Sequence, residues 1–97
     1  MPEHDLQFNL PVSFFKEGKS IVAYCKVLDL STCGKNLKDA QRMFDEAATI
    51  FLEELVKMGT LEEVLLDLGW EKKNHQFMPP LELLHTQTPI SVSMLHA

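Results

Sequence analysis

The segment from Leu37 to Met58 constrains the fold most, because its apolar residues recur at intervals of three and four positions. This spacing puts them on one side of an α-helix, as a stripe about six turns long. An isolated amphipathic helix is marginal in water, so the stripe must be buried against another element. The residues of the stripe are Leu37, Ala40, Met43, Phe44, Ala47, Ala48, Phe51, Leu55 and Met58.

Capping residues mark both ends of this helix. The Asn36 side chain can accept a hydrogen bond from an N–H group of the first turn, where the Asp39 carboxylate is also favourable. Gly59 predicts the end of the helix. Thr60 and Glu63 form a capping-box pattern and predict a second, shorter helix. Its apolar side consists of Leu61, Val64, Leu65 and Leu68.

Three short strands are predicted before the helices. Residues Leu6 to Phe14 alternate between apolar and polar, which is typical of a half-buried strand, and Pro11 places that strand at a sheet edge because proline has no N–H to donate. Residues 17–19 predict a turn, Ile21 to Val27 a second strand, and Ser31 to Cys33 a brief third strand. These elements predict an antiparallel meander that covers the helical stripe.

The pattern changes after Trp70. Trp70 and Phe77 are candidate anchors of a strand that returns to the sheet, and Pro79-Pro80 blocks any further helix. Ile90 to Met94 alternates like a final strand, which would pair with a sheet edge in this subunit or in a neighbouring one. This strand and the edge near Pro11 predict a homo-oligomer. The predicted fold is α+β: a three-stranded antiparallel meander, a long helix, a short helix and a C-terminal strand.

Composition indicates one ordinary folded domain spanning residues 1–97. The chain has 97 residues, of which 45% are hydrophobic and 24% charged. It has neither an apolar run long enough for a membrane span nor a basic N-terminal leader, so a cytoplasmic protein without a membrane partner is predicted. Cys25 and Cys33 are predicted to be free thiols, and the strand position of Cys25 predicts that it is buried.

The negative charge is concentrated in the predicted helices. Residues 36–68 contain three cationic and eight anionic side chains, a balance of −5 that equals the net charge of the whole chain. Such a surface repels phosphate, so no direct nucleic-acid binding is expected, whereas a basic protein partner would suit it. The alternative is that these carboxylates only keep the outer helical surface solvated. The predicted partner-binding residues are Glu53, Glu54, Glu62, Glu63 and Asp67.

No pattern in the chain predicts catalysis, a cofactor or a metal site. The four histidines have no cysteine or carboxylate at a ligand spacing, and no glycine-rich phosphate loop is present. Asp29 lies between two predicted strands and is interpreted as a turn residue. The sequence therefore predicts a protein that is not an enzyme. The histidines are His4, His75, His85 and His96.

Four segments, in order along the chain, resemble the HicB-like antitoxin domain. The resemblance covers roughly residues 6 to 70 and implies a partial ribonuclease-H-like fold of β-β-β-α-β order. It also implies a partner, HicA, which is a small basic toxin that cleaves messenger RNA with a histidine. An acidic antitoxin would be steered toward such a toxin by its charge. The segments are Phe8-Asn9-Leu10-Pro11-Val12, Val22-Ala23-Tyr24-Cys25, Leu28-Asp29-Leu30-Ser31-Thr32 and residues 59–70 from Gly59-Thr60-Leu61 to Gly69-Trp70.

The chain also departs from that family. Lys26 stands where the family often has proline, and Gly34-Lys35-Asn36 stands where it often has Gly-Asp-Thr. The C-terminal extension, residues 71–97, carries no DNA-binding module of the kind that many such antitoxins append. Three hypotheses therefore stay open: a HicB-like antitoxin, a stand-alone HicB-like structural or regulatory oligomer without a toxin, and an enzyme with an unrecognised site.

Overall fold

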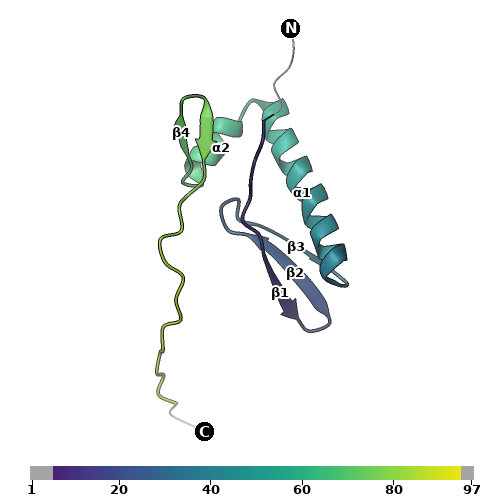
Figure 1. Cartoon of the computed structure of the whole chain (residues 1–97), viewed down its shortest axis with the longest axis vertical. Coiled ribbons are helices and arrows are strands. Elements are labelled where there is room, and N and C mark those ends of the chain that lie inside the picture. Colours follow the sequence, from purple (N-terminus) through teal and green to yellow (C-terminus); the bar gives the residue numbers. More distant parts are fainter. Residues whose placement is uncertain (1–5, 95–97) are drawn as a thin grey trace.

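The computed structural model describes residues 6–94 and shows an α+β fold (Figure 1). A three-stranded antiparallel sheet is followed by a long helix, a short helix and a separate two-stranded hairpin, so the predicted fold class is confirmed. The elements are β1 (Ser13–Glu17), β2 (Ser20–Cys25), β3 (Leu30–Gly34), α1 (Leu37–Met58), α2 (Leu61–Asp67), β4 (Glu71–Lys73) and β5 (Gln76–Met78).

The sheet is the predicted meander, with β2 in the centre and β1 and β3 at the edges. Glu17 pairs with Ser20 across the first turn, where Gly18 has a φ of 63°. Cys25 pairs with Leu30 across the second turn. β2 ends two residues earlier than predicted because the chain reverses direction after Cys25, although Val27 is still buried in that turn.

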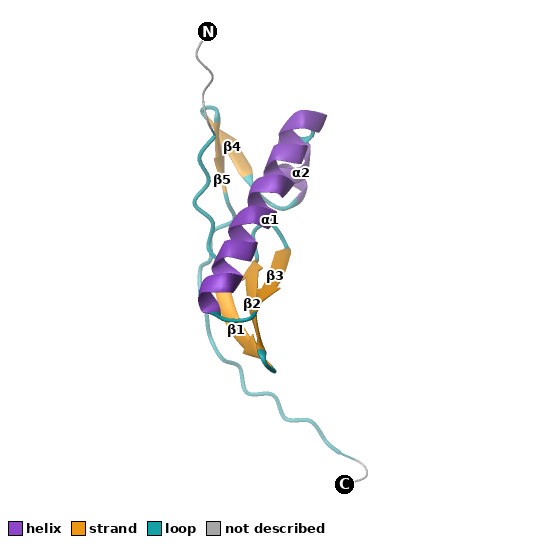
Figure 2. Ribbon diagram, turned by 90° about the vertical axis from the view of Figure 1, so that its right-hand side faces the viewer, coloured by secondary structure: helices purple, strands orange, loops and turns teal. Residues whose placement is uncertain are grey.

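Helix α1 packs on one face of the sheet, mainly against β3 and β2 (Figure 2). Its first turn lies directly on Gly34. A Cβ atom at that position would lie 2.7 Å from Ala40 Cα and 2.8 Å from the carbonyl carbon of Asp39. The core that results consists of Ala23, Cys25, Val27, Leu28, Ala40, Phe44, Ala48, Leu55, Leu61, Leu65 and Trp70. Four members of the predicted stripe are therefore buried, whereas Leu37, Met43 and Met58 at its margins are exposed.

The predicted caps of α1 are confirmed, but the capping box of α2 is not formed. The Asn36 side chain accepts a hydrogen bond from the Asp39 N–H at 2.8 Å, and Gly59 ends α1 with a φ of 70°. The Thr60 hydroxyl makes no capping bond. Thr60 instead belongs to the end of α1, because its N–H donates to the Leu55 carbonyl at 2.9 Å. This bond fixes the Thr60 backbone away from the extended conformation that a capping side chain needs.

The N-terminal strand is shorter than predicted. Residues 6–12 run in an extended path without a ladder, and only Ser13–Glu17 pair. The alternation is nevertheless correct, since Phe8, Leu10 and Val12 are partly buried and the residues between them are exposed. A ladder is missing because no second strand lies beside this segment. The ring of Phe8 packs edge-on against Trp70, with 5.9 Å between ring centroids.

The predicted strand after Trp70 is present, but it does not return to the main sheet. Trp70 is buried and donates its indole N–H to the Val27 carbonyl at 2.8 Å. The strands β4 and β5 pair only with each other, next to α2 (Figure 1). The predicted strand at Ile90 to Met94 is not formed in the single chain, because residues 79–94 run outward as an extended arm (Figure 2). Among residues 6–94, no helix combines the length and apolar character needed to cross a bilayer.

Candidate protein-interaction surfaces

The five predicted partner-binding carboxylates are all exposed. Glu53 and Glu54 lie in the last turns of α1, Glu62 and Glu63 in the first turn of α2, and Asp67 at the end of α2. Only a two-residue connection separates the helices, so the C-terminal end of α1 and the short helix α2, which carry these residues, lie at the same end of the molecule (Figure 1).

Two of these carboxylates have cationic neighbours. Lys57 Nζ lies 3.9 Å from Glu54, and Lys72 Nζ lies 2.6 Å from Glu62. The side chains of both pairs are 44–73% exposed, so each pair contributes little stability. Within residues 6–94, the other three carboxylates, those of Glu53, Glu63 and Asp67, have no cation within ion-pairing distance. Their negative charge is therefore available to a partner.

An exposed leucine lies among these carboxylates and was missed by the sequence reasoning. Leu66 in α2 is 49% exposed, whereas Leu61 and Leu65 carry the buried side of that helix. Glu62 and Glu63 lie four and three positions before Leu66, so they are its neighbours on the helix surface. The sequence did contain a signal for this exposed residue, because Leu66 is apolar but does not belong to the predicted apolar side of α2. We call Glu53, Glu54, Glu62, Glu63, Leu66 and Asp67 the acidic surface.

A groove, whose margin includes Glu53 of the acidic surface, was also not predicted. It has a volume of about 1150 Å³ and runs between the extended segment 6–14 and one flank of α1. Because α1 packs on β2 and β3, the side of β1 that faces the helix is left without a cover. Its apolar lining consists of Leu6, Phe8, Leu10, Val12, Phe14, Phe44, Ala48, Leu52 and Val56, and its polar margin of Gln7, Gln41, Asp45, Thr49, Glu53 and Lys57. The sequence could not show this groove because it depends on where α1 sits on the sheet.

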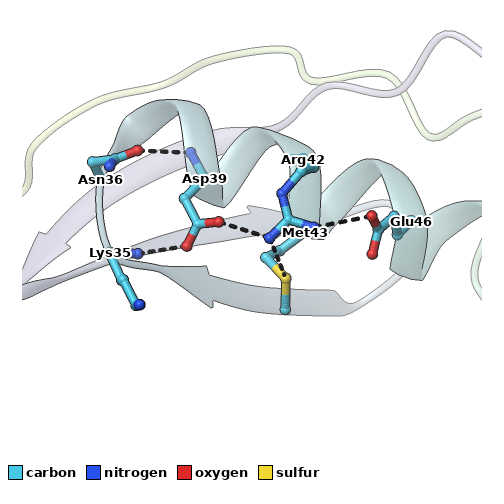
Figure 3. Close-up of polar contacts among 6 residues, drawn as sticks. All are labelled: Lys35, Asn36, Asp39, Arg42, Met43 and Glu46. Atoms are coloured by element: carbon cyan, nitrogen blue, oxygen red, sulfur yellow. Dashed lines mark hydrogen bonds and ion pairs between the residues drawn. The ribbon is translucent and has the colours of Figure 1, made fainter.

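A cluster of charges surrounds the start of α1 (Figure 3). The guanidinium of Arg42 donates to Asp39 at 2.8 Å and to Glu46 at 3.0 Å, and the Lys35 N–H donates to Asp39 at 2.9 Å. The Lys35 N–H, together with Arg42, holds the pKa of Asp39 below its usual value. The hydrogen bond to Asp39 raises the pKa of Arg42. These charges neutralise one another and stabilise the first turns of α1.

The remaining titratable groups are dispersed. Cys25 is buried and burial raises the pKa of its thiol, whereas Cys33 is exposed. Asp29 lies in the β2–β3 turn with a φ of 51° and accepts a hydrogen bond from the Tyr24 hydroxyl at 3.3 Å, which agrees with its interpretation as a turn residue. In the described part of the chain, no three His, Cys, Asp or Glu side chains are grouped closely enough to hold a metal ion. Two of the four histidines, His4 and His96, lie outside the described residues.

Comparison of the chain with protein-family models, with curated proteins and with solved structures gave no match. The family resemblance of residues 6–70 therefore stays a prediction, and the function proposed below combines it with the acidic surface.

Proposed function

We propose that this protein is a non-catalytic HicB-like antitoxin that binds and neutralises a small basic HicA-type toxin, one that cleaves messenger RNA. The protein would act in the cytoplasm, where such a toxin meets its substrate. The observation that carries the proposal is the acidic surface, in which Leu66 is exposed and three carboxylates, those of Glu53, Glu63 and Asp67, have no cation of the described chain within ion-pairing distance.

The composition of the acidic surface fits a basic protein. A specific interface commonly has an apolar centre and a polar rim, and Leu66 with its flanking glutamates has that arrangement on a small scale. Unneutralised carboxylates accelerate the encounter with a basic partner and disfavour other acidic proteins. A ribonuclease needs a basic surface to hold the phosphates of RNA. An acidic protein bound at that surface would exclude the RNA.

The proposal is tested by using the full chain as bait in its native cell and identifying the captured proteins by mass spectrometry. We expect a small basic protein whose ribonuclease activity falls when this chain is added. Association of the two purified proteins is then measured by stopped flow at several salt concentrations. Because rim charges act mainly on the association rate, this rate should fall as salt rises.

A triple variant with Glu53→Lys, Glu63→Lys and Asp67→Lys tests the placement of the interface. These three carboxylates form no ion pairs among the described residues, so the fold should be retained. We expect the association rate to fall at least tenfold and to become less sensitive to salt. The control for reversing one charge elsewhere is Glu17→Lys at the β1–β2 turn, an exposed position; it changes the net charge by about a third as much as the triple variant does. An unchanged rate in the triple variant would exclude the acidic surface as the docking site.

The second candidate is a stand-alone HicB-like structural or regulatory oligomer without a toxin. The outward arm favours it, because six large apolar side chains in residues 81–94 are 76–87% exposed in the single chain. Capture of only the chain itself in the same pull-down, with no basic ribonuclease, would support this candidate and reject the antitoxin.

A further inference from the structure

The arm formed by residues 79–94 leaves the folded body of the protein. The molecule measures 67 × 30 × 22 Å, and its radius of gyration is 17.4 Å. A compact domain of this length would have a radius of gyration of about 12.5 Å. In both views the arm continues past the sheet and ends beyond it (Figures 1 and 2). Pro80 still lies beside Gly69, but from Leu81 onward the arm is not packed on its own chain.

The arm has the pattern of a strand that lacks its sheet. Ile90, Val92 and Met94 alternate with Ser91 and Ser93, and the three apolar side chains are 76–79% exposed. No backbone hydrogen bond joins residues 79–94 to any other described segment. An apolar, unpaired strand of this kind is expected to pair with the edge of another sheet.

The groove offers such an edge. Its wall, residues 6–12, is extended and also makes no backbone hydrogen bond to another described segment. The wall continues directly into β1, whose outer edge is free. Apart from Pro11, every residue of the wall has an N–H to donate. A strand added along the wall would direct every second side chain toward α1.

The dimensions of the arm and the groove agree. The flank of α1 that lines the groove runs from Gln41 to Lys57, which is about 24 Å along the helix. Seven extended residues, 88–94, span about 23 Å. The groove is open and exceeds the roughly 300–1,000 Å³ of small-molecule pockets, so its size suits an extended peptide better. Residues 81–87 would span about another 23 Å, as a connection between the folded body of one copy and the groove of a second copy.

We propose that two copies of this chain exchange their arms. Residues 88–94 of each copy add as a strand to residues 6–12 of the other, and Ile90, Val92 and Met94 enter the groove between that wall and α1. The exchange is reciprocal, so one two-fold arrangement fills both grooves and covers both arms. It also gives residues 6–12 and 90–94, which both alternate in the sequence, the ladder that they lack in the single chain. This assembly does not depend on the antitoxin proposal, because the acidic surface is mostly outside the groove.

The oligomeric state of the full chain tests the exchange. Sedimentation velocity should give twice the 11.1 kDa mass of one chain at micromolar concentration. Val92→Asp changes a side chain that is 79% exposed in the single chain, so the fold of that chain should be retained. The new carboxylate is buried only when the arm is docked. We expect the substitution to raise the dissociation constant of the dimer at least 100-fold, since a carboxylate would be buried without a partner.

The groove is tested by a matched pair of substitutions in α1. Val56→Asp changes a lining residue that is 53% exposed and should dissociate the dimer to the same extent. Ile50→Asp changes a residue that is 60% exposed on α1 but does not line the groove, and it should leave the dimer intact. Circular dichroism of each variant verifies that the fold is retained.

Mixing the two defective variants distinguishes exchange from docking of the arm on its own body. The Val56→Asp copy has an intact arm and the Val92→Asp copy an intact groove, so a heterodimer contains one undamaged arm–groove pair, which neither homodimer contains. The mixture should therefore associate more tightly than either variant alone. A monomeric full chain, a dimer that survives Val92→Asp, or a mixture that does not associate would each overturn the proposal.

Discussion

Substitution of Gly34 by alanine tests the contact on which the fold depends. Gly34 ends β3, and the first turn of α1 crosses directly over it. An added Cβ would lie 2.7 Å from Ala40 Cα and 2.8 Å from the carbonyl carbon of Asp39. These are backbone atoms, so no side chain can rotate away, and the helix must move off the sheet by roughly half an ångström or more.

The cost follows from this displacement. Overpacking a close contact destabilises a protein by about 1–3 kcal/mol, and the upper end applies because the clash is with backbone. Alanine recovers at most about 1 kcal/mol by restricting the unfolded chain. We therefore expect Gly34→Ala to lose at least about 2 kcal/mol of unfolding free energy, from a total of about 5–15 kcal/mol. The Tm should fall by about 8–16 °C.

Urea denaturation followed by circular dichroism measures this loss. The control is Gly18→Asn. Nothing lies within 4 Å of a Cβ atom at Gly18, and asparagine tolerates its positive φ of 63°, so a change below about 1 kcal/mol is expected. If Gly34→Ala unfolds within about 0.5 kcal/mol of the wild type, the close approach of α1 to β3 is refuted.

Four further predictions concern single groups. Trp70→Phe should cost about 1–3 kcal/mol in urea denaturation, because it leaves the buried Val27 carbonyl without its 2.8 Å hydrogen bond. Asn36→Ala should cost about 1 kcal/mol by removing the cap of α1, again measured in urea. In the native protein, a thiol reagent should modify exposed Cys33 readily and buried Cys25 only on unfolding, which mass spectrometry of the labelled peptides will show. Burial raises the pKa of Cys25, so the contribution of its neutral thiol to stability is complete below the unfolded pKa of about 8.5 and is lost as the pH rises above it. In urea denaturation, the unfolding free energy should therefore fall less at alkaline pH in Cys25→Ala than in the wild type.

Local patterns were sufficient for the helices. The apolar stripe of α1 and its caps at Asn36 and Gly59 depend on residues within a few positions of one another. Both caps were predicted correctly, and so was the centre of the stripe, whereas its marginal residues are exposed. The prediction of a capping box at Thr60 was wrong, because the same backbone cannot both close the end of α1 and adopt the conformation that caps the start of α2. Its backbone had already been fixed by the hydrogen bond to Leu55 that closes α1.

The acidic surface could be located only in part. The carboxylates were predicted from charge alone, and the structure places them on the ends of two adjacent helices. Glu54 is paired with Lys57 three positions along the same helix, but the pairing of Glu62 with Lys72 depends on how β4 lies against α2. Leu66 became recognisable only when the buried side of α2 was known.

The sequence by itself determined the α+β class, the order of the elements and the alternation of residues 6–14, because periodicity and caps are local properties of the chain. Only the tertiary structure decided that α1 covers β2 and β3 and leaves a groove beside β1. It also decided that residues 6–12 and 90–94 have no strand partner in a single chain. Alternation shows that a segment has one apolar side, but a ladder requires a second strand at hydrogen-bonding distance, and that is set by the packing of the whole chain.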